Sequence, residues 1–278
     1  MRRTLLLVAL VPLAVGCGAA PSSSPGLGGA PEKMVAAGSS RISVSYGGRQ
    51  FFAGEFDFKR NVGSFAWGTT KRDAEWDQIL APDGTYARIP RELFSGSSDA
   101  AWLKLGAGSK GQPPFGFGPS DPARLLDLLK AASSVHQVKS GEERGVPVAR
   151  YRATLDLERA LRELRDDERA AFRALIRQYW VDGAEKGIPL DLAVDHDGLL
   201  RRVELTIPEG QELTVEFFDY GLDVVAKPPP SDQVVTLEEL VRSQFERCSE
   251  NEKGADDPTA CANEASIHIW GPTLDLKP

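Results

Sequence analysis

Short segments in which apolar and polar residues alternate constrain the fold of this 278-residue chain more than any other feature. In Gln50–Phe58, for example, Phe52, Phe56 and Phe58 share one face, and acidic residues occupy the other. This period of two is the pattern of a β-strand with one buried face. Turn residues such as Gly-Gly, Asn and Pro-Asp-Gly separate the segments, so consecutive strands are expected to pair antiparallel. The ten clearest segments are residues 41–46, 50–58, 62–67, 74–80, 85–89, 135–140, 146–155, 188–194, 199–207 and 212–220.

Stretches with helical periodicity interrupt these strands. Pro122 predicts a helix start, and a leucine-rich run follows it. A longer stretch, Leu157–Trp180, has one apolar stripe and one charged side, which predicts an amphipathic helix. A third, short helix is expected after Thr236, because Thr236 and Glu239 have capping-box spacing. Since a sheet of about ten strands tends to curl, we predict an α+β fold, a curved antiparallel half-barrel packed over two or three helices.

The charge of the chain excludes some partners. The sequence holds 33 Lys and Arg and 40 Asp and Glu residues. Loss of the leader described below removes Arg2 and Arg3, which leaves 31 basic against 40 acidic residues and a net charge of −9. Affinity for nucleic acid comes mainly from neutralising phosphates, so no nucleic-acid partner is expected. An acidic chain is also drawn poorly to anionic lipid headgroups, and attachment to a membrane would need covalently bound lipid.

The N-terminus has the order of an export signal. Two arginines precede an apolar run over residues 5–15, and Cys17 follows after small residues. This run is shorter than the ~20 residues that span a bilayer, so residues 1–16 are predicted to be a cleaved signal peptide. The small residues before Cys17 resemble the lipobox of bacterial lipoproteins. This resemblance implies that acylated Cys17 anchors the protein to the outer face of the cell membrane, whereas the alternative is a plain signal peptide with an incidental cysteine.

Two segments flank the expected domain, residues 41–235. Residues 17–40 are rich in Gly, Ser, Pro and Ala and predict a flexible tether, because such a segment buries too little apolar surface to become ordered. Residues 236–278 form a C-terminal extension that contains Cys248 and Cys261. In an oxidising compartment this pair predicts a disulfide, which would contribute roughly 3 kcal/mol. A metal site is the competing interpretation, although two thiols and a distant histidine lack zinc-site spacing.

The sequence contains no familiar catalytic motif. It lacks the Gly-x-Ser-x-Gly elbow, the His-Glu-x-x-His zinc motif and a phosphate loop ending in Lys-Ser/Thr. His136, His196 and His268 are predicted to be ordinary strand or turn residues. The run from Asp195 to Gly198 predicts a hairpin turn with Gly198 at positive φ, and the alternative, a calcium loop, lacks its closing glutamate. We therefore expect no enzyme, no cofactor and no metal.

The middle of the chain resembles a known protein family. The stretches Gly145–Asp156, Ile188–Arg202 and Phe218–Gly221, the last running into Lys227–Pro230, look like actinobacterial cell-envelope lipoproteins of the LppX/LprG type. The resemblance covers Asp121–Val234 well and the first strands by pattern only. It implies a LolA-like fold, in which a half-barrel sheet and helices enclose a hydrophobic cavity. It also implies a role in binding acylated lipids or lipoglycans and moving them across the envelope.

This resemblance transfers no ligand contact by motif, because cavity walls in this family are generic apolar side chains. The candidate lining is therefore taken from the apolar faces of the strands and the apolar stripe of the long helix. It comprises Phe52, Phe56, Trp76, Leu161, Ile176, Leu190, Leu192, Leu205 and Phe217. The alternative for the strand aromatics is an ordinary packed core. A second hypothesis for the same fold is a non-enzymatic surface sensor or interaction module, whose protein partner the sequence does not identify.

Overall fold

Twelve strands of the chain form one sheet. The computed structural model describes residues 29–67, 77–88, 102–105, 122–164, 169, 173, 187–207, 211–236, 238–240 and 242. Within this part the strands are β1 (Ser39–Tyr46), β2 (Arg49–Asp57), β3 (Val62–Trp67), β4 (Asp77–Ala81), β5 (Gly84–Arg88), β6 (Trp102–Leu105), β7 (Ala132–Glu143), β8 (Val146–Leu155), β9 (Ile188–Asp195), β10 (Leu200–Ile207), β11 (Gln211–Phe218) and β12 (Val234–Thr236). Their order in the sheet is β12-β6-β5-β4-β3-β2-β1-β11-β10-β9-β8-β7.

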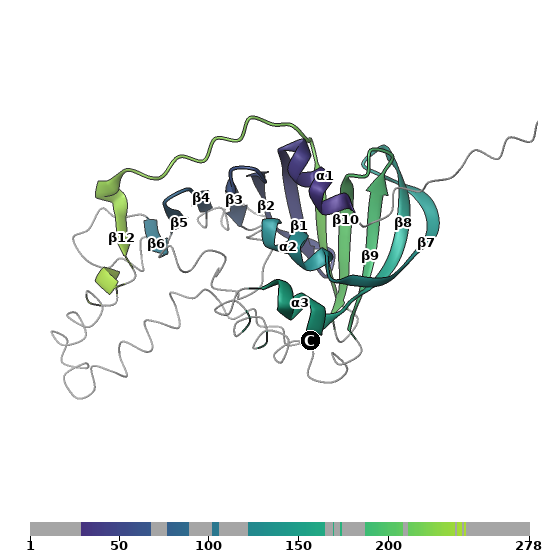
Figure 1. Cartoon of the computed structure of the whole chain (residues 1–278). Coiled ribbons are helices and arrows are strands. Elements are labelled where there is room, and N and C mark those ends of the chain that lie inside the picture. The colour runs from purple at the N-terminus through teal and green to yellow at the C-terminus, as the bar shows by residue number, and fades with distance from the viewer. Residues whose placement is uncertain are drawn as a thin grey trace, which may run out of the picture.

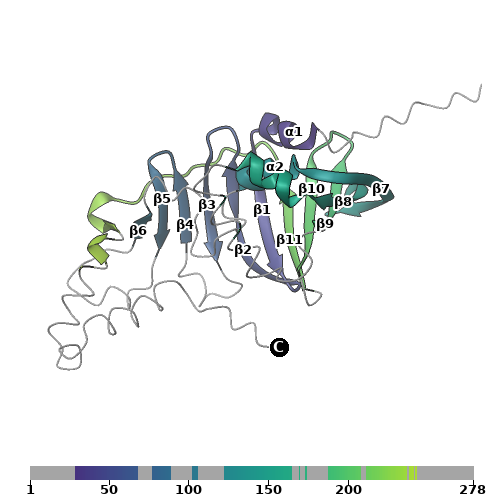
Figure 2. The same cartoon turned by 60° about the horizontal axis from the view of Figure 1, so that its bottom comes forward.

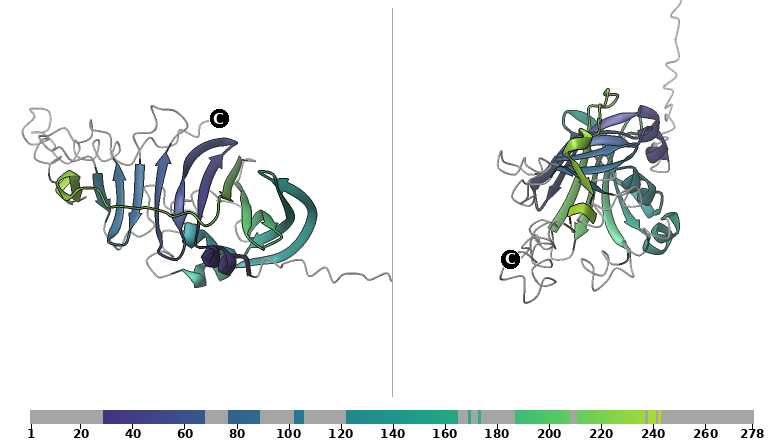
Figure 3. Two further views of the ribbon diagram at one scale, coloured as in Figure 1. Left: turned by 90° about the horizontal axis from the view of Figure 1, so that it is seen from above. Right: turned by 90° about the vertical axis from the view of Figure 1, so that its left-hand side faces the viewer.

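The described helices lie on one side of this sheet. They are α1 (Ala30–Ala37), α2 (Pro122–Leu129) and α3 (Leu157–Glu163). A short 3-10 turn, η6 (Ser231–Gln233), directly precedes β12 at the far edge of the sheet. Figure 1 shows the three helices over the half of the sheet that contains β1 and β8–β11, while β3–β6 extend away from them. Figure 2 shows α1 and α2 over the same half from another side. Seen from above, β7 and β8 curve round toward the helix side (Figure 3). The predicted fold class, a curved and open antiparallel sheet over a few helices, is confirmed.

The strand register separates an apolar concave face from a charged convex face. Residues opposite each other in an antiparallel pair point to the same side of a sheet. On the concave side Ile42 pairs with Phe217, and Val44 pairs with both Val215 and Phe52. On the convex side charged residues are paired instead, as in the 3.1 Å contact between Arg41 Nε and a Glu55 carboxylate oxygen. Exposed ion pairs of this kind contribute little stability, but they keep the convex face polar.

One contiguous hydrophobic core joins the concave face to the helices. Met34 of α1, Leu126 and Leu128 of α2 and Ala160 of α3 are all buried in it. Burying a large apolar side chain stabilises a fold by about 1.5–3 kcal/mol, so this layer is a main source of stability. The strand residues of the core are drawn from β1–β4 and β8–β11.

The predicted tether is wrong for its last eleven residues, 30–40, because helix α1 and the start of β1 are part of the folded domain. Pro31 stands at the start of α1, and Gly38 ends it with φ of 91°. Ala30 and Met34 are buried against the core. The composition misled the prediction because small residues let a helix pack closely on a sheet without large apolar side chains.

The predicted long helix, Leu157–Trp180, is not continuous. Asp156 caps α3 by accepting a hydrogen bond from the backbone N–H of Arg159, as its position before an apolar run suggests. The helix ends at Glu163, because Leu164 is extended, with φ of −90° and ψ of 150°. The guanidinium of Arg169 donates to the carbonyls of Leu161 and Leu164, at 2.8 and 2.9 Å, and so satisfies acceptors that a continued helix would have used.

The strand predictions hold with small shifts at the ends. The segment β8 has the predicted bounds, Val146–Leu155, whereas β7 runs on to Glu143. The turn between them is therefore Arg144–Gly145, both at positive φ, rather than a five-residue turn. The sheet also gains β12, which is parallel to β6 and reaches it through an extended strap, residues 222–230, drawn in green along the upper edge of the sheet in Figure 1.

Candidate functional site

Aromatic rings form a flat patch on the concave face, over β2 and β3. The rings of Phe52 and Phe65 stack with centroids 4.5 Å apart. The ring centroid of Phe56 lies 6.2 Å from that of Phe65, with the ring planes inclined at 29°, and Phe58 meets Phe56 edge to face at 5.2 Å. Stacked and edge-to-face contacts of this kind add about 0.5–1.5 kcal/mol each beyond burial. We call Phe52, Phe56 and Phe65 the aromatic floor.

Two glycines allow the rings of the aromatic floor to lie against the sheet. Gly54 is opposite Phe65 in the β2–β3 pair, and Gly63 is opposite Phe56. A Cβ at Gly54 would lie 2.1 Å from the carbonyl oxygen of Ser64 and 2.4 Å from the Phe65 ring. A Cβ at Gly63 would lie 2.8 Å from the Phe56 ring. Glycine is therefore required at both positions, because any side chain would push the rings off the backbone.

The structure brings most of the predicted lining residues together. Six of them are almost fully buried members of the hydrophobic core, and Leu161 is half-buried against it. The six are Phe52, Phe56, Leu190, Leu192, Leu205 and Phe217. Trp76 and Ile176 lie outside the described residues, as do Cys17, Cys248 and Cys261. That the buried residues face a bound ligand remains a prediction.

Two buried polar groups on the concave face were missed by the sequence analysis. Ser40 is 0% exposed and pairs across the sheet with Phe56, which places it on the concave side. Gln78 is 5% exposed and pairs with Phe65. Ser40 Oγ and Gln78 Oε1 are both without a hydrogen-bond partner, judged within the described part of the chain. The sequence could have revealed Gln78, because it stands two residues before Leu80 in the same strand and therefore points to the same buried face.

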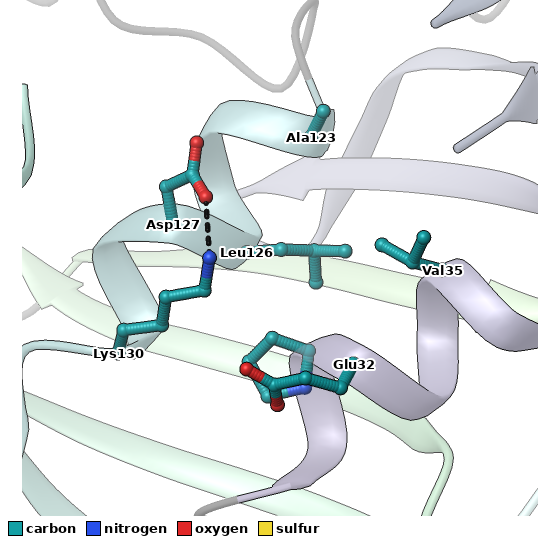
Figure 4. Close-up of a pocket in the computed structure, with 7 residues that line it drawn as sticks. Glu32, Val35, Ala123, Leu126, Asp127 and Lys130 are labelled. Carbon is teal, nitrogen blue, oxygen red and sulfur yellow. Dashed lines mark hydrogen bonds and ion pairs between the residues drawn. The ribbon is translucent and has the colours of Figure 1, made fainter. Parts of the chain in front are cut away.

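An open groove lies between α1 and α2, with a volume of about 280 Å³. Its walls are largely apolar, and charged side chains stand at its rim (Figure 4). At the rim the Lys130 ammonium donates to Asp127 at 2.9 Å, and this hydrogen bond raises the pKa of Lys130 above its usual value. The groove, which we call the α1–α2 groove, is lined by Pro31, Glu32, Val35, Ala123, Leu126, Asp127 and Lys130.

The β9–β10 turn holds α1 in place beside this groove. The predicted hairpin is confirmed, with Gly198 at φ of 82°, and Lys33 of α1 donates to the carbonyl of Asp197 at 2.5 Å. Asp195 is 2% exposed. One of its carboxylate oxygens accepts from two turn N–H groups, and the other accepts from Arg201 at 2.7 Å. Both carboxylate oxygens are thus used within the turn, which favours the hairpin over the calcium loop.

Tyr220 is a second residue that holds α1 against the sheet. Its hydroxyl donates to the carbonyl of Leu200 and lies 3.1 Å from the sulfur of Met34. The guanidinium of Arg201 sits 4.8 Å from the centre of its ring. Burial raises the pKa of the Tyr220 phenol well above its usual value, so the phenol stays neutral and remains a donor at physiological pH.

Two of the three histidines lie in the described part of the chain. His136 and His196 are exposed, and His268 lies outside the described part. Within that part no three His, Cys, Asp or Glu side chains come together as a metal site would require. None of its helices is both long and apolar enough to cross a bilayer. The described residues thus combine a buried apolar surface on the sheet with a partly apolar groove between two helices.

The comparison of sequences relates this chain to an annotated relative. No protein-family model matches it. A protein of Streptomyces coelicolor named as a predicted lipoprotein, SCO4650, is 26% identical over 187 residues, which is 64% of this chain and 55% of that protein. The chain therefore spans about half the length of this relative.

The comparison of structures finds proteins of the type that the sequence resembles. The lipoprotein LppX from Mycobacterium tuberculosis matches 74% of this chain and 100% of its own, with 11% identity and a TM-score of 0.46. LprF from Mycobacterium bovis matches 74% of this chain and 95% of its own, with 10% identity and a TM-score of 0.46. LppX itself is thus among the solved structures that this chain is similar to. At these identities the likeness concerns the shape of the chain.

Proposed function

We propose that this protein is an exported lipoprotein, anchored through acylated Cys17, that binds the hydrocarbon part of a lipid against the concave face of its sheet. The observation that carries the proposal is the continuous apolar concave wall, with the aromatic floor lying flat on Gly54 and Gly63. Each CH₂ group buried on such a wall contributes about 0.8 kcal/mol. Binding and carrying a lipid requires no catalytic group, so we propose a carrier rather than an enzyme.

The α1–α2 groove is the proposed entry for the lipid. Its volume of about 280 Å³ is near the lower end of the roughly 300–1,000 Å³ typical of ligand pockets, so it suits part of an acyl chain rather than a whole lipid. Cys17 precedes Ala30, the first residue of α1, by 13 positions. A linker of that length reaches at most about 45 Å, which keeps the groove close to the bilayer surface.

A protein-interaction module is the second candidate function, and strand β7 favours it. Among the described strands β7 pairs with β8 alone. It also presents Val135 and Val138 to solvent, at 40% and 46% exposure. An open strand edge can accept a strand from another protein. The two register irregularities in β7 oppose such pairing, which is why we place this function second.

Lipid capture by the mature chain tests the first function. Residues 17–278 carrying Cys17→Ser, so that no acyl group of its own is present, are purified from an actinobacterial host and weighed by native mass spectrometry. We expect added mass from a co-purified lipid, and saturable binding of a fluorescent fatty-acyl probe after that lipid is removed. A chain without added mass that also leaves the probe unbound would show the proposal to be wrong.

A pair of exposed valines tests the entry. Val35→Glu places a charge in the α1–α2 groove and is expected to slow uptake of the probe severalfold, because a carboxylate is costly to bury beside a hydrocarbon chain. Val225→Glu is the matched control, since Val225 is 61% exposed on the strap and lines no part of the groove. Equal uptake rates for the two variants would exclude the groove as the entry.

A further inference from the structure

Two buried polar side chains mark the ends of the aromatic floor. Ser40 on β1 lies in one row across the concave face with Phe56 on β2 and Gly63 on β3. Gln78 on β4 lies in the neighbouring row with Phe65. Strands in a sheet are spaced 4.7–4.9 Å apart, so the step from β1 to β4 is about 14 Å. The floor of aromatic rings and glycines lies between the two polar groups.

Each of these two side chains has a buried oxygen without a hydrogen-bond partner among the described residues. Ser40 is 0% exposed and Gln78 is 5% exposed, and neither Ser40 Oγ nor Gln78 Oε1 has a hydrogen bond within the described part of the chain. Native proteins rarely bury polar atoms in this state, because the lost hydration is not replaced. Thr85, opposite Leu80 on the same face, is a further buried polar residue of this region. A ligand that supplies hydrogen bonds at these points would remove the penalty.

We infer that the lipid bound by this protein carries hydroxyl groups, and that the Gln78 amide and the Ser40 hydroxyl recognise them. This inference rests on the proposed function and adds the class of ligand to it. A hydroxyl both donates and accepts, so it can pair with an amide oxygen and with a serine hydroxyl. The apolar floor between the two residues receives the hydrocarbon. An ester or hydrocarbon without hydroxyl groups leaves both residues unpaired and binds less tightly.

Two lipids that share one acyl chain test the inference. Monooleoylglycerol carries two hydroxyl groups, and methyl oleate carries none. Equilibrium binding of each is measured on the mature chain, residues 17–278 with Cys17→Ser, and on the same chain with Gln78→Met. Both hydroxyl groups of monooleoylglycerol lie at its glycerol end, so one molecule can reach only one of the two polar residues. We expect the first chain to prefer monooleoylglycerol by about tenfold, the effect of about one net hydrogen bond. Gln78→Met should lose most of that preference, with its affinity for methyl oleate unchanged.

Further variants separate recognition from folding. Gln50→Met is the matched control, because Gln50 lies on the convex face, where Ser43 donates to it, and it should keep the wild-type preference. Gln78→Met removes a buried amide oxygen that has no partner among the described residues, so the melting temperature of the unliganded protein should stay the same or rise. If that variant does not fold, Ser40→Ala replaces it and is expected to reduce the preference severalfold.

Each outcome decides the question. A wild-type chain that binds both lipids equally, or a Gln78→Met chain that keeps the full preference, overturns the inference and leaves the proposed function intact. A wild-type chain that binds neither lipid, nor any fatty-acyl probe, overturns the proposed function and the inference with it.

Discussion

Replacing Asp195 with alanine is expected to destabilise the domain strongly, because a buried ion pair would lose one partner. The Asp195 carboxylate is fully shielded from solvent, and the Arg201 side chain beside it is 17% exposed. Breaking such a pair costs roughly 3–5 kcal/mol, since the remaining charge stays buried. The N–H groups of Asp197 and Leu199 lose their acceptor at the same time. For a chain of this size, the melting temperature should fall by roughly 10 °C.

A milder substitution separates the charge from the geometry of the turn. In Asp195→Asn the amide oxygen still accepts from the turn N–H groups, but the charge facing Arg201 is gone, so the loss should be smaller. The variants Asp195→Asn, Arg201→Met and their combination form a double-mutant cycle, measured by urea unfolding and tryptophan fluorescence. We expect the double variant to lose clearly less than the sum of the two single losses. Additivity within about 0.5 kcal/mol would refute a coupled pair.

Three further predictions follow from other parts of the molecule. Gly54→Ala should cost roughly 1–3 kcal/mol by overpacking, because its Cβ would strike backbone as well as the ring, whereas Gly29→Ala, with nothing within 4 Å, should unfold close to the wild-type temperature. Burial alone would raise the pKa of the Asp57 carboxyl, but hydrogen bonds from the Arg60 backbone and guanidinium outweigh it and lower that pKa. The stability that this contact adds is therefore present above the ordinary carboxyl pKa of 3.8 and lost as the pH falls through the lowered pKa of the folded state, so Asp57→Asn should lower the melting temperature at pH 7 and have little effect at the acid end. Cys17→Ser should move the protein from the membrane fraction to the soluble fraction of a cell extract, and a protein that stays in the membrane fraction would argue for another anchor.

Local patterns were sufficient for most strands. The segments Val62–Trp67 and Val146–Leu155 have the predicted bounds, because each is bordered by turn residues and has side chains that alternate between a buried and a polar face. The capping box after Thr236 is also confirmed, since Glu239 accepts from the Thr236 backbone and Thr236 accepts from the Glu239 N–H. These features depend on residues within a few positions of each other.

The sequence analysis was wrong where the structure depends on contacts between residues far apart in the chain: it did not predict helix α1, and it made the helix that begins at Leu157 too long. Helix α1 is held by Lys33 and Met34, which contact the turn after β9 and Tyr220, more than 160 residues later. The break after α3 depends on Arg169 folding back onto the helix carbonyls. No helical period or propensity near these residues carries that information.

The candidate site was predictable in its composition but not in its arrangement. Period-two patterning placed Phe52 and Phe217 on buried faces, and both lie in the core. The pairing of Gly54 with Phe65, which lays the aromatic ring on the neighbouring strand, depends on the register between β2 and β3. The unpaired Gln78 amide oxygen becomes a candidate ligand contact only when the sheet places it beside the aromatic floor.

The sequence by itself determined the succession of strands and the apolar side of each, because these follow from residues close together in the chain; the lipoprotein-like leader stays a prediction. Only the tertiary structure decided that β1 pairs with β11, which puts residues such as Arg41 and Phe218, 177 positions apart, side by side at the centre of the sheet. That pairing brings α1 over the concave face and next to α2, and so forms the groove. Its cause is burial of one shared apolar surface, a property of the assembled sheet that no single segment contains.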